Sequence, residues 1–183
     1  MQNILNCDQS QLVVIDMQEK LAGAMPAEAL VAVLKKQTIL LQAAQILAVK
    51  TIITEQYPQG LGATLSELTV IVPATKTISK TAFSACKEPA FVAQMQRDKS
   101  QIVLCGMEAH ICVLQTALDL LHAGKTVYVV EDSIISRDPA NKANAVARLQ
   151  SAGCVITNTE SVVFEWLGNA NHQAFKAISK LIK

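Results

Sequence analysis

Aromatic residues are scarce in this chain, at 4%, although apolar residues as a whole make up 51%. An apolar content supplied mainly by Ala, Val, Ile and Leu favours helices packed on a buried sheet over an all-β sandwich. No apolar run approaches the roughly 20 residues of a membrane span, and the opening "MQNILNCDQS" lacks the pattern of a signal peptide. These absences predict a cytoplasmic globular protein without a membrane partner.

An excess of charge of either sign is missing as well, since the formal net charge is +1 at pH 7. The basic residues are scattered, so the sequence offers no electrostatic footprint for nucleic acid. Linkers rich in Pro, Gly or Ser and internal repeats are also absent. A chain of this length buries roughly 70% of its unfolded surface, which suffices for one core. A single domain over residues 1–183 is therefore predicted.

Cysteines in the pattern CxxC are missing too, and the cysteine count is odd, at five. This count and spacing indicate reduced thiols in a cytosolic protein. Cys105 lies inside an apolar run and is interpreted as a small core residue. The same interpretation applies to Cys7, Cys86 and Cys154, which leaves Cys112 as the candidate for chemistry.

Short apolar runs alternate with amphipathic segments along the chain. Helical patterns follow Pro26, Pro89, Cys112 and Pro139, and the C-terminal region contains one or two more. The alternation predicts an α/β fold, with a doubly wound, mainly parallel six-stranded sheet between two layers of helices. The predicted strands are 11–16, 50–54, 75–79, 101–106, 126–131 and 154–158.

Three chemically active side chains follow or end predicted strands. In the common strand order 3-2-1-4-5-6, strands one and four meet at a switch point, and ligands bind beyond their carboxyl ends. Asp16 ends the first strand, Lys80 follows the third and Cys112 follows the fourth, so all three are predicted at one edge. A Gly-rich dinucleotide fingerprint is absent, because Gly106 stands alone with Glu108 where a second glycine is needed. A nucleotide cofactor is therefore not expected.

The position of Cys112 at a helix start leaves two resting states open. A free thiol has a pKa of about 8.5, and a helix N-terminus typically contributes only about 0.3–1 kcal/mol toward the thiolate. A lysine ammonium about 4 Å away would contribute about 4 kcal/mol at an effective dielectric of 20, whereas an ionised Asp16 opposes the thiolate. The site therefore holds either a thiolate stabilised by Lys80 or a neutral thiol whose proton Asp16 removes.

Each of the three residues also has a structural interpretation. A cysteine in a buried α/β fold is more often a core residue, an aspartate at a strand end is often a loop cap, and a lysine in a loop is often solvated. The predicted convergence of Asp16, Lys80 and Cys112 on one edge favours the functional interpretation for all three.

Six segments spread over nearly the whole chain carry a resemblance to a known family. They are "VVIDMQEK" (13–20), "TEQYPQGLG" (54–62), "SKTAFS" (79–84), "CGMEAHICVLQTALDLL" (105–121), "EDSIISR" (131–137) and "FKAISKLIK" (175–183). In these segments the chain resembles the isochorismatase-like cysteine hydrolases, in particular their isochorismatase domain-containing branch. The resemblance implies a doubly wound α/β sheet, an Asp–Lys–Cys triad and a homo-oligomer.

By this resemblance, Asp16 matches the acid/base, Lys80 the lysine and Cys112 the nucleophile. The implied reaction is metal-independent cleavage of a small amide-like carbonyl substrate through a thioester on the cysteine. The family also implies a cis peptide at Met107–Glu108, and an oxyanion hole formed by the backbone N–H groups of Glu108 and Cys112. The alternative is a catalytically idle binding or scaffold protein that keeps the fold.

Metal ligands are missing at the place where some relatives have them. Nicotinamidases of this superfamily bind a metal through an Asp-x-His…His stretch after strand two, whereas "TEQYPQGLG" contains neither Asp nor His. His122 is interpreted as solvated, and His172 lies in the C-terminal region. His110, beside the nucleophile, is interpreted as steering the loop or packing. No metal and no other cofactor are expected.

Further residues are predicted to line or rim a substrate pocket. Phe83 is expected either to stack on a flat substrate or to pack in the core, and Gln18 to hydrogen-bond the loop or a ligand. Leu21 stands where many relatives carry an aromatic residue, which changes the expected pocket shape. The full set of candidates is Gln18, Leu21, Glu55, Tyr57, Phe83 and His110.

Overall fold

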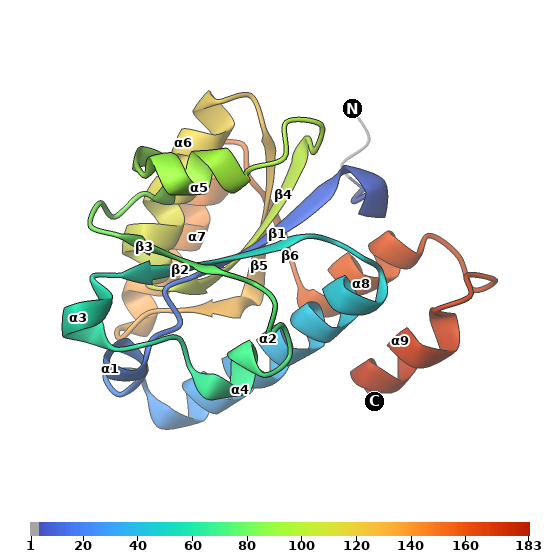
Figure 1. The fold of residues 1–183 in the computed structure, drawn as a ribbon, viewed down its shortest axis with the longest axis horizontal. Helices are drawn as coiled ribbons and strands as arrows, with labels where there is room; N and C mark the ends of the chain where they lie inside the picture. The colour runs from blue at the N-terminus through green and yellow to red at the C-terminus, as the bar shows by residue number, and fades with distance from the viewer. Residues whose placement is uncertain (1–3) are drawn as a thin grey trace.

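Six parallel strands form one sheet in the computed structural model, which describes residues 4–183 (Figure 1). The strand order is β3-β2-β1-β4-β5-β6, so β1 and β4 are neighbours at the switch point, as predicted. All five strand pairs are parallel, which confirms the α/β class. The strands are β1 (Ser10–Ile15), β2 (Thr51–Gln56), β3 (Thr77–Lys80), β4 (Gln101–Met107), β5 (Thr126–Ile135) and β6 (Val155–Thr157).

Helices cover both faces of this sheet, as Figure 1 shows. Helices α2, α4, α8 and α9 contribute to one core, and α5, α6 and α7 contribute to the other. Within residues 4–183, no helix is both long and apolar enough to cross a membrane. The α-helices are α1 (Glu19–Ala22), α2 (Ala27–Ile46), α3 (Pro58–Leu61), α4 (Ser66–Thr69), α5 (Pro89–Gln94), α6 (Leu114–His122), α7 (Pro139–Ser151), α8 (Thr159–Leu167) and α9 (Phe175–Ile182).

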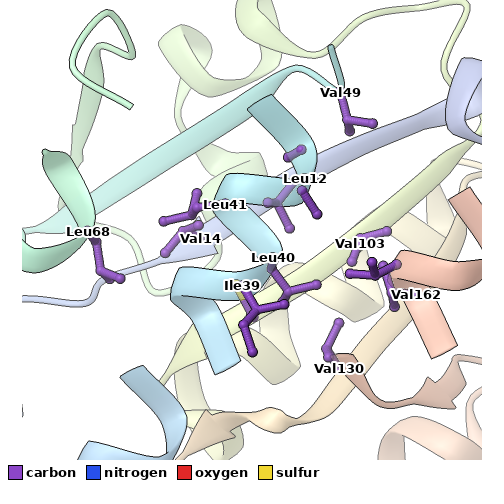
Figure 2. Close-up of a cluster of buried hydrophobic side chains, with 14 of the residues drawn as sticks. Leu12, Val14, Ile39, Leu40, Leu41, Val49, Leu68, Val103, Val130 and Val162 are labelled. Carbon is purple, nitrogen blue, oxygen red and sulfur yellow. The ribbon is translucent and has the colours of Figure 1, made fainter. Parts of the chain in front are cut away.

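The apolar residues of β1 divide between the two cores. Leu12 and Val14 pack into the core beneath α2, and Val13 and Ile15 pack into the core on the opposite face. Successive side chains of a strand point to opposite faces, so a strand that is apolar throughout is buried on both. Figure 2 shows the first core, where Leu12 and Val14 lie among side chains of α2, β4, β5 and α8.

Local capping chemistry explains where α7 begins. Asp138 is the N-cap and its carboxylate accepts a hydrogen bond from the Ala140 N–H at 2.8 Å, while Pro139 occupies the first helical position. A proline is tolerated there because the first helical N–H groups have no partner within the helix. The predicted start of this helix is confirmed.

Each strand differs from its predicted range by at least one residue, and the differences at β3, β5 and β6 are described here. β3 is shifted to Thr77–Lys80, so Lys80 ends the strand and pairs with Gln56 of β2. β5 continues to Ile135, because its end pairs with β4 beyond a register shift at Leu104 and Gly106. β6 is shorter than predicted. β3 ends where its pairing with β2 ends, and β5 ends where its pairing with β4 ends, which a local pattern does not reveal.

Close packing of β1 against β4 depends on Gly106. Its φ is +122°, and a Cβ built there would overlap the backbone oxygen of Ile15 and lie 2.6 Å from its nitrogen. A side chain therefore has no room where the two strands meet at the switch point.

Candidate active site

Asp16 leaves β1 in a left-handed conformation that redirects its side chain. Its φ is +50°, a region that Asp enters more readily than most residues. Strict alternation would place Asp16 on the α2 face, one residue after Ile15. Its carboxylate instead contacts Thr54 and Lys80. Thr54 lies two residues after Ile52 on β2, and Lys80 lies two residues after Ile78 on β3. Ile52 and Ile78 belong to the second core, so Thr54 and Lys80 are on the same face of the sheet as that core. The turn of the backbone therefore carries the carboxylate to the face that holds Cys112.

Asp16 and Lys80 form an ion pair that is closed to solvent. The Lys80 Nζ lies 2.6 Å from the Asp16 Oδ2, and both side chains are 0% exposed. The ammonium also donates to the Gln56 Oε1 at 2.7 Å and to the carbonyl oxygens of Ala82 at 3.3 Å and Phe83 at 3.1 Å. The ammonium is thus surrounded by acceptors, and its position is determined by residues of β2 and of the loop after β3.

Cys112 lies beside this pair in the second core and is only 6% exposed. Burial, and next the negative charge of Asp16, raise the pKa of its thiol to about 12, while the nearby Lys80 acts in the opposite direction. The three predicted residues are therefore brought together, and of the two resting states the neutral thiol is favoured.

The turn that carries Cys112 is wider than an α-helical turn. Residues Ala109–Val113 form a π-helical turn, and α6 begins only at Leu114. Cys112, predicted at the point where the turn becomes a helix, therefore lies inside this first turn, two residues before the regular α-helix. Such π-turns are frequent at functional sites, and nothing in the apolar spacing of the following helix distinguishes one from an ordinary helical turn.

Two backbone N–H groups in and before this turn differ in bonding from those of a regular helix. The Met107–Glu108 peptide bond is cis. The Glu108 carbonyl accepts from the N–H groups of Ile111 at 3.1 Å and Val113 at 3.3 Å, and the N–H of Cys112 between them is not bonded to it. Among residues 4–183, the N–H of Glu108 has no hydrogen-bond acceptor.

Glu108 and His110 are held against the end of β5. The buried carboxylate of Glu108 accepts from the Arg137 backbone N–H at 3.0 Å and from its Nε at 3.1 and 3.2 Å. His110, which is half-buried, places its Nδ1 3.0 Å from the Ser136 Oγ. These contacts suit the interpretation of His110 as a residue that steers the loop.

Gln18 and Glu55 tie down the loop after β2. The Gln18 amide donates to the carbonyl oxygens of Gln56 at 3.0 Å and Gly62 at 2.7 Å, and it accepts from the Gln56 N–H at 2.7 Å. Glu55 Oε1 accepts from the N–H and the hydroxyl of Thr64, each at 2.7 Å. Both side chains are buried, so of the two interpretations of Gln18 its contacts favour the loop, and Glu55 shares that role.

The remaining pocket candidates lie at different depths. Leu21 is half-buried and packs against the first core, whereas Cys112 belongs to the second. Tyr57 and Phe83 are exposed, at 56% and 53%. Core packing, the structural alternative for Phe83, does not fit this exposure.

The largest hollows described in the protein lie away from the triad. One of about 770 Å³ lies between α5 and α6 and contains Phe91, and one of about 650 Å³ lies by the start of β2. Neither is lined by Asp16, Lys80 or Cys112. In the described part of the chain, no three His, Cys, Asp or Glu side chains gather into a group that could hold a metal. The absence of a metal stays a prediction.

Sequence comparison places these residues in a family. The isochorismatase domain model matches residues 10–161. This chain belongs to the isochorismatase family. Isochorismatase domain-containing protein 2 of Bos taurus is 37% identical over 174 residues, covering 95% of this chain and 83% of that protein. The family resemblance predicted from the sequence is therefore confirmed.

Solved structures agree with the isochorismatase assignment. The MAR1 ribonuclease of Caenorhabditis elegans superposes with a TM-score of 0.91 at 35% identity, covering 98% of this chain and 92% of that one. YcaC of Pseudomonas aeruginosa, solved with hexane-2,5-diol and covalent acrylamide, superposes with a TM-score of 0.88 at 25% identity, covering 99% and 92%. The predicted doubly wound α/β fold is confirmed.

In this isochorismatase-family chain, Thr54 is a residue of the site that the sequence did not single out. Thr54 donates to the Asp16 Oδ1 at 2.7 Å, and Gln56, which was expected only at the pocket rim, accepts from the Lys80 ammonium. The signal that could have found these contacts is the spacing of the two residues. Two residues apart on β2, they share the face on which Lys80 of the adjacent strand lies.

Proposed function

We propose that this isochorismatase-family protein is a metal-independent cysteine hydrolase that cleaves a small amide-like carbonyl compound. The observation that carries the proposal is the fully buried Asp16–Lys80 pair acting on the Cys112 thiol. A buried ion pair is poor support for a role in stability alone, because desolvation offsets its attraction. A fully buried pair of this kind beside a nucleophilic atom favours a catalytic site, because such pairs perturb the protonation of the groups that they contact.

The reaction begins from the neutral thiol. As the Cys112 sulfur attacks the carbonyl carbon, Asp16 accepts the thiol proton and passes it to the leaving amine, so that a thioester and a free amine result. Asp16 then accepts a proton from a water molecule while the oxygen of that water attacks the thioester carbon. That proton returns to the departing sulfur, and the carboxylic acid is released. Lys80 balances the negative charge that Asp16 and the sulfur carry in turn.

Stabilisation of the tetrahedral intermediate is assigned to two backbone groups. The two groups are the backbone N–H of Glu108 and the backbone N–H of Cys112. Neither donates a hydrogen bond to another backbone group described above, so each can donate to an oxyanion. Preorganised donors of this kind typically contribute about 10²–10³ in kcat each. The Glu108 carboxylate is bonded to Arg137 instead and is not a participant.

A small substrate suits the limited access to the sulfur, since Cys112 is only 6% exposed. The P. aeruginosa YcaC structure contains covalent acrylamide. Acrylamide is itself a small amide with an electrophilic carbon, and this supports its use as a probe of Cys112. We further propose that the protein forms a homo-oligomer, as the resemblance implies, and light scattering on the purified protein measures this directly.

The experiment that tests the function is a screen of small amides for released ammonia. The wild type, Cys112→Ala and Cys105→Ala are compared, because Cys105 is a buried thiol whose sulfur contacts the Val13 carbonyl and not the triad. We expect release by the wild type and by Cys105→Ala, and none above background by Cys112→Ala. Unchanged release by Cys112→Ala would exclude Cys112 as the nucleophile.

Two rivals are distinguished in the same experiment. The C. elegans relative is named a ribonuclease, at 35% identity, so a labelled RNA is included as a substrate. RNA cleavage that survives Cys112→Ala but is lost in Asp16→Asn would replace the amide proposal. No turnover of any substrate, together with equal labelling of Cys112 and Cys105 by acrylamide, would favour the idle scaffold.

A further inference from the structure

We propose that Thr54 is a positioning residue that assigns separate tasks to the two oxygens of Asp16. In this assignment the Thr54 hydroxyl holds Oδ1, and Oδ2 is the oxygen that exchanges the proton with Cys112. The inference rests on the proposed hydrolase function and deepens it, because it names the atom that acts as the base and the residue that selects it.

One threonine holds Asp16 at two points. The Thr54 hydroxyl donates to Oδ1 at 2.7 Å, and the Thr54 carbonyl accepts from the Asp16 N–H at 3.1 Å. Both residues are 0% exposed, so water does not replace either contact. Asp16 has a left-handed φ of +50° and lies beyond the regular strand. Contacts with Thr54 therefore maintain both its unusual backbone and the rotation of its carboxylate.

The second oxygen remains free to take a proton. The Lys80 ammonium is 2.6 Å from Oδ2, and no other hydrogen-bond donor among the described residues contacts that oxygen. A carboxylate oxygen has two lone pairs, so one can face the ammonium while the other accepts a proton. An ionised carboxylate only accepts, so the hydroxyl of Thr54 must be the donor. Its bond to Oδ1 persists whether or not Oδ2 is protonated.

Without this bond, Oδ1 of Asp16 would be a buried acceptor without a hydrogen-bond donor. Hydrogen bonds to the charged form of a carboxylate favour that form. Loss of the bond is therefore expected to make the base harder to keep ionised and to let it rotate away from the thiol. Small misplacements of a reacting group can cost about a hundredfold in rate.

The test compares Thr54→Val, which removes only the donor, with Thr54→Ser, which keeps it. Ammonia release gives kcat, KM and the pH profile, and mass spectrometry gives the rate of acrylamide addition to Cys112. For Thr54→Val we expect kcat and the addition rate to fall by about tenfold to a hundredfold. KM should be nearly unchanged, and the acidic limb of the kcat profile should move to higher pH. Thr54→Ser should return both rates to within about threefold of the wild type.

A matched control separates positioning from stability. The buried hydroxyl of Thr159 donates to the Asp132 carboxylate at 2.8 Å, away from the triad. Thr159→Val loses the same kind of bond, and its rates should equal those of the wild type. If Thr54→Val keeps wild-type rates while Cys112→Ala is inactive, the inference about Thr54 fails and the proposed function stands. If the wild type neither releases ammonia nor adds acrylamide at Cys112 faster than at Cys105, both fail.

Discussion

Breaking the Asp16–Lys80 pair should destabilise the protein far more than removing both of its charges. Lys80→Met deletes the ammonium and keeps most of the side-chain volume, and it leaves a buried carboxylate without its countercharge. Asp16→Asn leaves the buried ammonium of Lys80 without its countercharge. The double variant leaves neither charge, so its loss should be much smaller than the sum of the two single losses.

The magnitude follows from the geometry of the pair. At 2.6 Å the gross attraction is about 6 kcal/mol at an effective dielectric of about 20. Because both side chains are 0% exposed, neither charge recovers hydration when its partner is removed. Each single variant should therefore lose about 3–5 kcal/mol, which corresponds to a fall in Tm of about 6–20 °C for a chain of this size.

The assay is urea unfolding followed by circular dichroism at one protein concentration, arranged as a double-mutant cycle. A surface pair provides the control. The Lys36 Nζ and the Asp132 Oδ2 are 3.6 Å apart, with side chains 40% and 31% exposed, so Lys36→Met should cost less than about 1 kcal/mol. Single losses at Asp16 and Lys80 as small as that at Lys36, or losses that simply add, would refute this view of the site.

Two further predictions concern the thiol and the switch point. The first measurement is the ultraviolet absorbance of thiolate as a function of pH, compared between the wild type and Cys112→Ala. The difference between the two should stay flat to about pH 10 and rise only toward about pH 12. The reason is that burial and the charge of Asp16 raise the pKa of the Cys112 thiol to about 12. A rise near neutral pH would indicate a resting thiolate. Gly106→Ala should lose at least about 2 kcal/mol in urea unfolding, because its Cβ meets the backbone of β1. Gly124→Ala, whose Cβ meets nothing within 4 Å, should lose only about 1–2 kcal/mol for its positive φ.

Local patterns were sufficient wherever the structure depends on neighbours in the chain. The continuous apolar run of β1 predicted a strand buried on both faces, because its side chains alternate between two cores. Asp138 and Pro139 predicted the start of α7, because capping involves only residues a few positions apart. Alternation of strands and helices then restricted the topology to a parallel sheet, and the switch point followed.

Boundaries that depend on a neighbouring strand were less predictable. β5 continues through the polar residues Asp132 and Ser133, because β4 offers pairing partners beyond its register shift. Gln18 was open to two interpretations, and its three hydrogen bonds to the backbone of Gln56, at the end of β2, and of Gly62, in the loop that follows, favour the one in which it holds the loop. In both cases the deciding partner is distant in the sequence.

The sequence by itself determined the fold class and the edge of the sheet at which Asp16, Lys80 and Cys112 gather, since these depend on the period and order of its segments, and its motifs indicated the family by resemblance. Only the tertiary structure decided how these three side chains are oriented, hydrogen-bonded and buried at that edge. Asp16 reaches the face of Cys112 through its left-handed backbone, Thr54 donates a hydrogen bond to one of its oxygens, and burial raises the pKa of the Cys112 thiol. Desolvation and hydrogen bonding between distant strands set these properties, and both arise only once the chain has folded.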